Sequence, residues 1–560
     1  MKRVRSIAVS MVMGCSLTLG QVPAAVADPS SETPAPTTAE PAAPSAPGSS
    51  VSSTPEPGAR STFDQAAPST PDPAVPATSV PAAPSAADPT APPAVGPTPP
   101  AAQADPGPSA FQRWIDDHIP GPASILPRTG SAAAAPEASP GGLWKAIQSS
   151  PTGDPFFDVA PANLAQYAPG DIIQTRDVTW PAVPMVFLTV LTPVQHAVQL
   201  KFRTTNSAGE PSFGTATLLL PFNKWTGPGS RPVLLNAPPI NALNRRCTPG
   251  YVFSHGYDLT SGNGNDFVPS PTMWAASQNY AVVIPDHEGP LMSYAEPTVA
   301  GHIMLDTVRA VRHLMPDQFG ESRFAMTGYS GGAIASYSAS MLSSEYAPEL
   351  SPYLVGAAMG GLPVDYESFA RTFDGTYASG LMLSVTLALA REHPEILGRM
   401  NHLAQWAAIS PLKDVCSSTM ADVGVFVPYA ALANMRDPLH TEFADMLFRR
   451  LSLKGKKAGM PIYVYNGLHD PWIPVANADA FFDQQCALGV PATKSIVGGE
   501  HILGYFDGFL GSTHWLGERL SGVPAADNCQ VAPRSNTAPQ QSNSSDPASS
   551  APRPATSPGP

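Results

Sequence analysis

Short, almost wholly apolar runs alternate with segments of helical spacing between residues 216 and 497. The strand candidates are 216–221 (ATLLLP), 232–237 (PVLLNA), 280–285 (YAVVIP), 324–327 (FAMT), 353–359 (YLVGAAM), 461–466 (PIYVYN) and 493–497 (TKSIV). Residues 298–315, between two of these runs, have the apolar spacing of a helix. Continuous apolar strands joined by helical crossovers predict a mostly parallel sheet with helices on both faces, which is the α/β class.

The two ends of the chain have a different composition. Residues 1–27 combine Lys2, Arg3 and Arg5 with an apolar stretch and the small-residue site AVA before Asp28, which predicts a secretion signal. Cys15 weakly matches a lipoprotein cleavage site, but the apolar run continues past it, which favours the ordinary signal.

Pro, Ala, Ser and Thr dominate residues 28–141 and 532–560, so we expect a disordered linker and a disordered tail. One island in the linker, 111–119 (FQRWIDDHI), predicts a brief helix or docking segment. Residues 126–130 (LPRTG) match a sortase signal in letters only, because no apolar span and basic tail follow them.

The remaining residues, 142–531, are enough for one domain with an inserted subdomain. No second apolar run is long enough for a transmembrane span.

The formal net charge of -13 and the pI near 5.3 disfavour nucleic acid as a partner. The histidines and cysteines lack the spacing of a metal site, so we expect no metal and no cofactor.

A candidate nucleophile follows the apolar run 324–327. Ser330 lies in the pattern G-x-S-x-G with Gly328 and Gly332, and small residues typical of a buried helix follow. A strand, a glycine-flanked serine and a helix are typical of a nucleophile elbow, in which the flanking positions are too close to other backbone for a Cβ atom. The alternative is an ordinary tight turn.

A serine nucleophile needs a base and an orienting acid, and in an α/β-hydrolase these follow it in the order acid, histidine. His501 comes just after the strand candidate 493–497, and His514 is a weaker alternative. Asp470 follows the strand candidate 461–466, and Asp365, one strand earlier, is the alternative acid. Either loop residue could instead only cap a helix or hold a turn.

About 140 residues separate Ser330 from Asp470, more than one strand and one helix require. The excess, about 366–459, contains apolar segments of helical character such as 380–391 and 430–435. We interpret it as a cap that covers the site and can supply an acyl-binding tunnel. The alternative is a helical insertion that only thickens the core.

Four cysteines remain after removal of the signal: Cys247, Cys416, Cys486 and Cys529. In an exported protein they predict two disulfides with three possible pairings, and free buried thiols are the alternative.

Several stretches together resemble the secretory lipase family of yeasts and actinomycetes, an α/β-hydrolase family, over about 154–529. They are DPFFDVAPANLAQYAPGDIIQTRDV from Asp154, CTPGY from Cys247, VIPDHEGP from Val283, GYSGGA from Gly328, LHDPWIP from Leu468 and GGEH from Gly498. The resemblance implies that Ser330, Asp470 and His501 are nucleophile, acid and base. It also implies a lid formed by the insertion, and the disulfides Cys247–Cys416 and Cys486–Cys529.

The same resemblance implies an oxyanion hole made by the backbone N–H groups of Gly331 and Asn241. The family position of Asn241 is commonly Asp, so this residue departs from the pattern. Because the backbone is the implied donor, we expect the function to survive the change.

These features predict a secreted serine carboxylic-ester hydrolase, a lipase or esterase that acts on acylglycerols or other acyl esters through an acyl-enzyme. We expect a monomer that is free outside the cell or associated with its envelope, and that can meet its substrate at a lipid–water interface. Two alternatives stay open: an envelope acyltransferase with the same triad, and a non-catalytic envelope-binding protein.

Overall fold

The computed structural model describes residues 107–122, 140–257, 268–416, 420 and 423–529, all within one compact unit, Gly96–Pro560. The strands are β1 (Ile172–Asp177), β2 (Val194–Thr205), β3 (Pro211–Pro221), β4 (Val233–Ala237), β5 (Ala281–Pro285), β6 (Phe324–Tyr329), β7 (Leu354–Gly360), β8 (Ile462–Gly467) and β9 (Ala492–Val497). The signal sequence, most of the linker and the tail predicted above lie outside the described residues.

The nine strands form one sheet in the order β1-β2-β3-β5-β4-β6-β7-β8-β9. β1, β2, β3 and β5 pair antiparallel, and from β5 to β9 all pairs are parallel. The seven predicted strands are all present, and together they form the mostly parallel sheet that the apolar runs predict.

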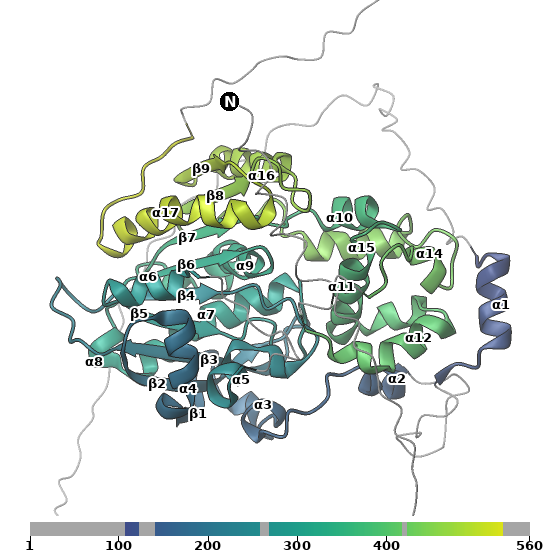
Figure 1. The fold of residues 1–560 in the computed structure, drawn as a ribbon, viewed down its shortest axis with the longest axis horizontal. Coiled ribbons are helices and arrows are strands. Elements are labelled where there is room, and N and C mark those ends of the chain that lie inside the picture. Colours follow the sequence, from purple (N-terminus) through teal and green to yellow (C-terminus); the bar gives the residue numbers. More distant parts are fainter. Residues whose placement is uncertain (1–106, 123–139, 258–267, 417–419, 421–422, 530–560) are drawn as a thin grey trace, which may run out of the picture. The chain divides into compact units, whose positions relative to one another are not determined.

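Helices cover both faces of the sheet, as Figure 1 shows. One face carries α7 (Pro297–Leu314), α9 (Gly331–Tyr346) and α16 (Val475–Ala487), and the other carries α4 (Thr179–Met185), α5 (Pro249–His255), α6 (Pro271–Ser277) and α17 (His501–Leu520). Strand side chains alternate between the two cores: Val233 and Leu235 belong to the first, and Leu234 to the second. Double coverage explains why the central strands are apolar throughout. Among the described residues, no helix has the length and apolar character that a membrane crossing needs.

Between β7 and β8 the chain forms a separate helical layer, which we call the cap. It contains α10 (Tyr366–Phe373), α11 (Ser379–Glu392), α12 (His402–Ile409), α14 (Tyr429–Leu432) and α15 (Glu442–Leu451), which lie together beside the sheet in Figure 1. The helix predicted at 380–391 is α11. The prediction at 430–435 is only half correct, because α14 ends at Leu432 and Ala433 then forms an extended bridge with Met400.

Short helices precede the sheet and link the other elements. α1 (Ala110–His118), α2 (Pro140–Ala146) and α3 (Pro155–Asp158) come first, and α8 (Pro316–Phe319) precedes β6. The remaining short helical segments are η2 (Leu164–Gln166), η3 (Val186–Val190), η4 (Arg245–Cys247), η5 (Pro348–Leu350), η6 (Pro394–Arg399) and η7 (Pro411–Asp414). α1 coincides with the island at 111–119, so the helix predicted there is present.

Candidate active site

The predicted nucleophile lies at a strained turn between β6 and α9. Ser330 has φ 55° and ψ -122°, a backbone conformation that is rare for a residue with a side chain. A Cβ atom on Gly328 would collide with the carbonyl oxygen of Gly332, and one on Gly332 would collide with that of Ala237. The steric reason given for the two glycines from the sequence therefore holds in the structure.

Three loops bring the predicted catalytic residues together at the carboxyl ends of β6, β8 and β9. The Nε2 atom of His501 lies 2.9 Å from the Oγ atom of Ser330, and its Nδ1 atom lies 2.6 Å from the Oδ2 atom of Asp470. Only 9% of His501 and 8% of Asp470 are exposed, so their contact is shielded from water. This geometry is that of a hydrogen-bonded Ser-His-Asp constellation.

Backbone groups fix the acid and the base in place. The Oδ1 atom of Asp470 accepts hydrogen bonds from the backbone N–H groups of Trp472 and Ile473, each 2.9 Å long, which leaves Oδ2 for the histidine. The hydroxyl of Tyr329, next to the nucleophile, donates to the carbonyl oxygen of His501. Glu500 caps the start of α17 through its carboxylate, and His501 is the first residue of that helix.

The two alternative residues point elsewhere. His514 lies on an exposed part of α17, where its Nε2 atom is 3.7 Å from Glu518. Asp365 caps α10 by accepting a 3.0 Å hydrogen bond from the backbone N–H of Ser368. The structure therefore brings Asp470 and His501 to Ser330, and places His514 and Asp365 in local structural roles.

The two predicted oxyanion-hole residues are neighbours. Gly331 is the first residue of α9, and a Cβ atom on it would collide with the side-chain oxygen of Asn241. Asn241 has a positive φ of 45°, and within the described part of the chain its buried Oδ1 atom has no hydrogen-bond partner. Its backbone N–H, like that of Ala242, interacts with the carboxyl group of Glu288. The donor role of Asn241 stays a prediction.

Asp286, His287 and Glu288 follow β5, and the sequence analysis did not predict their roles. Asp286 accepts from the backbone N–H of Gly250 at 2.7 Å, whereas His287 and Glu288 contact the segment that carries Asn241. His287 donates from Nε2 to the carbonyl oxygen of Pro238 at 2.9 Å, and burial lowers its pKa to about 4, which keeps the ring neutral. Burial raises the pKa of Asp286 to about 7 and that of Glu288 well above its ordinary value. The sequence did contain one signal for these roles, namely three consecutive ionisable residues directly after the strand candidate 280–285.

A buried arginine joins the cap to this segment. Arg391, at the end of α11, is 1% exposed and donates to the carbonyl oxygens of Leu243 and Leu291 at 2.9 Å and of Lys413 at 2.7 Å. Burial lowers its pKa to about 10, so the guanidinium stays charged at neutral pH. Arg391 therefore fixes the cap relative to the loop that carries Asn241.

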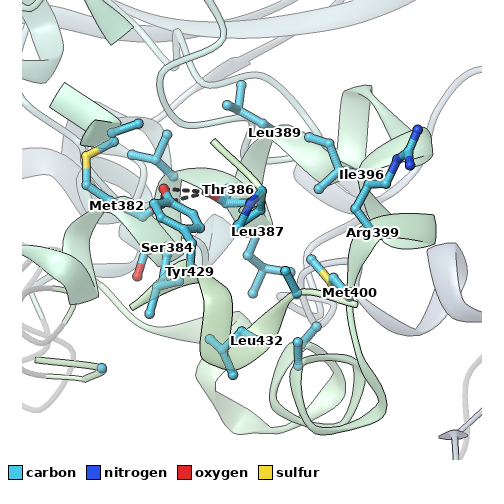
Figure 2. A pocket seen from close by; sticks show the side chains of 18 of the residues that line it. Met382, Ser384, Thr386, Leu387, Leu389, Ile396, Arg399, Met400, Tyr429 and Leu432 are labelled. Atoms are coloured by element: carbon cyan, nitrogen blue, oxygen red, sulfur yellow. Dashed lines mark hydrogen bonds between the residues drawn. The ribbon is translucent and has the colours of Figure 1, made fainter. Parts of the chain in front are cut away.

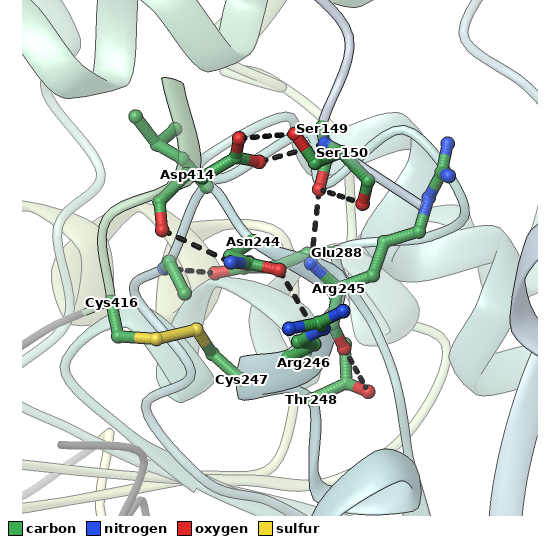
Figure 3. The surroundings of a disulfide bond; sticks show 12 residues. Ser149, Ser150, Asn244, Arg245, Arg246, Cys247, Thr248, Glu288, Asp414 and Cys416 are labelled. Carbon is green, nitrogen blue, oxygen red and sulfur yellow. Dashed lines mark hydrogen bonds between the residues drawn. A yellow bond between two sulfur atoms is a disulfide. The ribbon is translucent and has the colours of Figure 1, made fainter. Parts of the chain in front are cut away.

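The disulfide Cys247–Cys416 connects the same two regions, as Figure 3 shows. Beside it, the carboxylate of Asp414 accepts from the backbone N–H of Ser150 at 2.7 Å, and Asn244 donates to the Asp414 carbonyl at 3.1 Å. The second disulfide is Cys486–Cys529. This is the pairing that the family resemblance implies.

The cap encloses an apolar cavity of about 460 Å³. Its lining includes Met382, Leu387, Met400 and Leu432, and Figure 2 shows their side chains pointing into it. Leu243 and Tyr366 belong to the lining and also to a core cluster with Tyr294, whose ring lies beside Gly331. This core cluster therefore connects the cavity lining with the residue next to the elbow.

The strand order, the elbow after β6 and the loops after β8 and β9 define the α/β-hydrolase fold. Lipase A of Candida antarctica has this fold: its X-ray structure superposes with a TM-score of 0.58, at 24% identity, over 66% of this chain and 86% of that one. The fold class predicted from the sequence is confirmed.

The resemblance to the secretory lipase family is confirmed too, because the model of the family described as "Secretory lipase" matches residues 272–528. Lipase 10 of Candida albicans is 28% identical over 69% of this chain and 84% of that protein. The secreted triacylglycerol lipase LIP1 of Malassezia furfur is 25% identical over 67% and 77%. The chain is thus similar to lipase and esterase hydrolases.

One relative shows that this similarity does not by itself establish activity. The Mycobacterium tuberculosis protein named "Probable inactive lipase MT1628" is 28% identical over 68% of this chain and 84% of that protein. The activity of the present chain therefore depends on whether its own side chains have a catalytic geometry.

Proposed function

We propose that this protein is a serine carboxylic-ester hydrolase, a lipase or esterase that works through an acyl-enzyme. The observation that carries the proposal is the position of His501, whose two ring nitrogens contact Ser330 and Asp470 at 2.9 Å and 2.6 Å. An imidazole held between a hydroxyl and a buried carboxylate is the arrangement that activates serine.

In the first half of the reaction, Ser330 attacks the ester carbonyl while His501 takes the hydroxyl proton at Nε2. Asp470 keeps the Nδ1–H tautomer and stabilises the imidazolium that forms. The tetrahedral intermediate expels the alcohol, which receives the proton from His501. Water then attacks the acyl-enzyme with His501 as base, and the acid leaves with Ser330 restored.

The negative charge of the tetrahedral intermediate needs donors beside the elbow. The N–H group of Gly331 at the start of α9 is the first donor in this proposal, and Asn241 is the second, because Asn241 lies directly against Gly331. Loss of one oxyanion donor typically costs about 3 kcal/mol of transition-state stabilisation.

The cap cavity is the proposed place for the acyl chain. Its wall is almost entirely apolar, and a volume of about 460 Å³ suits an alkyl chain rather than a polar substrate. The lipases among the relatives support an acylglycerol or another lipid ester as the substrate. The secreted relative and the N-terminal signal pattern support a location outside the cell.

A fluorophosphonate probe tests the serine mechanism. We expect one probe molecule to add to the wild-type protein at Ser330, seen by peptide mass spectrometry, and none to add to Ser330→Ala. A second assay separates hydrolysis from acyl transfer. The enzyme is incubated with an ester substrate in water alone and in water with an added alcohol. Hydrolysis releases the free acid, whereas acyl transfer forms an ester of the added alcohol. Absence of labelling in both proteins would favour the non-catalytic alternative.

A further inference from the structure

Helix α1 lies in the Pro-rich part of the chain, before the region that resembles the secretory lipases. It begins with a complete capping box, in which Gln112 N donates to Ser109 Oγ at 3.2 Å and Ser109 N donates to Gln112 Oε1 at 2.6 Å. A defined helix start in a segment of this composition indicates that α1 has a docked position.

The first anchor of α1 is a glutamine buried against the cap. Gln112 is 1% exposed, and its Nε2 atom donates to the carbonyl oxygens of Ala430 and Met435 at 2.6 Å and 2.5 Å. Ile115, one turn later, is also 1% exposed. The glutamine thus satisfies two carbonyl groups of the irregular segment 430–435.

The second anchor lies on α12. Asp116 accepts a 2.8 Å hydrogen bond from the backbone N–H of His402, and the Nδ1 atom of His402 lies 2.6 Å from the Ile119 carbonyl oxygen. The indole N–H of Trp406 donates to the Pro120 carbonyl oxygen at 2.8 Å. Residues 109–120 therefore hold two parts of the cap that are separate in the sequence.

Both anchored parts are walls of the apolar cavity. Residues 431–433 and Met435 line it from one side, and Leu403, Ala404 and Ala407 of α12 line it from another. Phe111 of α1 itself also belongs to the lining. From within the cap, the backbone N–H of Asn401 donates to the Leu432 carbonyl oxygen and that of Asn434 donates to the Arg399 carbonyl oxygen, both at 2.9 Å. Gln112 adds the link from this segment to α1.

We propose that residues 109–120 are an intramolecular strap that fixes two walls of the cap cavity and thereby determines which acyl chains the cavity accepts. This inference rests on the proposed ester hydrolase function. Without the strap, the carbonyl groups of Ala430 and Met435 lose their partner, and the wall, then held only by contacts within the cap, can move outward. A wider cavity then admits longer chains.

The test compares Gln112→Ala with Trp114→Ala in the full chain. Trp114 is on the same helix, is 53% exposed and is not part of the cavity lining, so its substitution is the matched control. We expect Gln112→Ala to raise the ratio of kcat/KM for p-nitrophenyl palmitate over butyrate at least fivefold. The butyrate value and the control variant should stay within twofold of wild type. Hydrogen exchange at 430–435 should accelerate in Gln112→Ala alone.

An unchanged ratio together with unchanged exchange at 430–435 would overturn the proposal. If Gln112→Ala does not fold, Asp116→Ala takes its place, because it removes the acceptor for the backbone N–H of His402 at the second anchor and should raise the same ratio.

A binding assay separates failure of the strap from failure of the hydrolase. In the Ser330→Ala background, cis-parinaric acid should bind the chain and its affinity should change at least fivefold on Gln112→Ala. If the wild-type protein hydrolyses no ester, such a change in affinity would still support the strap, although the hydrolase function has failed. An equal affinity in both proteins would count against the strap.

Discussion

Ser330 keeps a backbone conformation that costs about 1–3 kcal/mol, and its surroundings explain why it persists. Because Gly328 has no Cβ atom, the carbonyl group of Gly332 can lie against β6. Because Gly332 has none, the carbonyl group of Ala237 can lie against α9. The backbone N–H of Ser330 also donates to the Gly360 carbonyl oxygen at 2.9 Å. The strain positions the hydroxyl toward His501, so at this residue conformation and chemistry are linked.

The first prediction concerns the acid. Asp470→Asn keeps the Oδ1 acceptor for Trp472 and Ile473 but places an amide N–H group opposite Nδ1 of His501. The histidine then changes to the wrong tautomer, and kcat should fall by about 10³–10⁴-fold. Steady-state hydrolysis of p-nitrophenyl butyrate measures the effect, with an unchanged circular dichroism spectrum as the control. A kcat within tenfold of wild type would show that Asp470 does not orient the base.

The second prediction asks which part of Asn241 acts. Glycine at 241 keeps the backbone N–H and accepts the positive φ of 45° without strain. If the backbone is the donor, Asn241→Gly should retain kcat within about tenfold. A loss of about 10²-fold or more, the typical effect of removing one oxyanion donor, would assign the role to the side-chain amide instead. Labelling by the fluorophosphonate probe controls for an intact elbow.

At the scale of elements, the loops after β6, β8 and β9 carry the proposed triad because parallel strands present their carboxyl ends at one edge. The positions of these three loops could be predicted, since the apolar runs 324–327, 461–466 and 493–497 end shortly before Ser330, Asp470 and His501. β1 and β2 were not predicted. β2 alternates apolar Val198, Leu200 and Phe202 with polar residues, which is a half-buried pattern rather than a continuous apolar run.

The contacts that support the loop of Asn241, a predicted oxyanion-hole residue, could not be predicted for a different reason. Arg391 is far from Leu243 and Leu291 in the sequence, and only the folded cap brings its guanidinium to their carbonyl groups. Sequence patterns identify the residue at a strand end, but not the partner that a distant helix supplies. The docking of α1 on the cap is another such contact.

The third prediction concerns the disulfide near the C-terminus. Cys486 and Cys529 are 43 residues apart, so the double variant Cys486→Ser, Cys529→Ser should lower the free energy of unfolding by about 4 kcal/mol. Urea denaturation of both proteins under non-reducing conditions measures the difference. Equal stability would mean that the cross-link does not restrict the unfolded chain as loop-closure entropy requires.

At the scale of the whole molecule, burial of charge makes stability depend on pH. Lys201 on β2 is 2% exposed and donates to the carbonyl oxygens of Phe156 and Val159, which joins α3 to the sheet. Burial lowers its pKa from 10.5 to about 8. Between these values the unfolded chain holds a proton that the folded chain has released, so stability should rise with pH across this window.

The fourth prediction follows from that sign. We expect the difference in the free energy of unfolding, wild type minus Lys201→Met, to rise by up to roughly 3 kcal/mol between pH 7.5 and pH 10.5. Urea denaturation at several pH values measures it, and Lys145→Met, at an exposed position, is the control. A relative stability that is flat across the window would show that Lys201 titrates normally.

The central claim is that Ser330 is the nucleophile of an ester hydrolase. The most direct measurement is hydrolysis of p-nitrophenyl esters from acetate to palmitate by the wild-type protein and by Ser330→Ala. We expect turnover in the wild type and a loss of at least about 10³-fold in the variant, with the fold intact. Equal rates, at the level of the uncatalysed reaction, would contradict the hydrolase assignment.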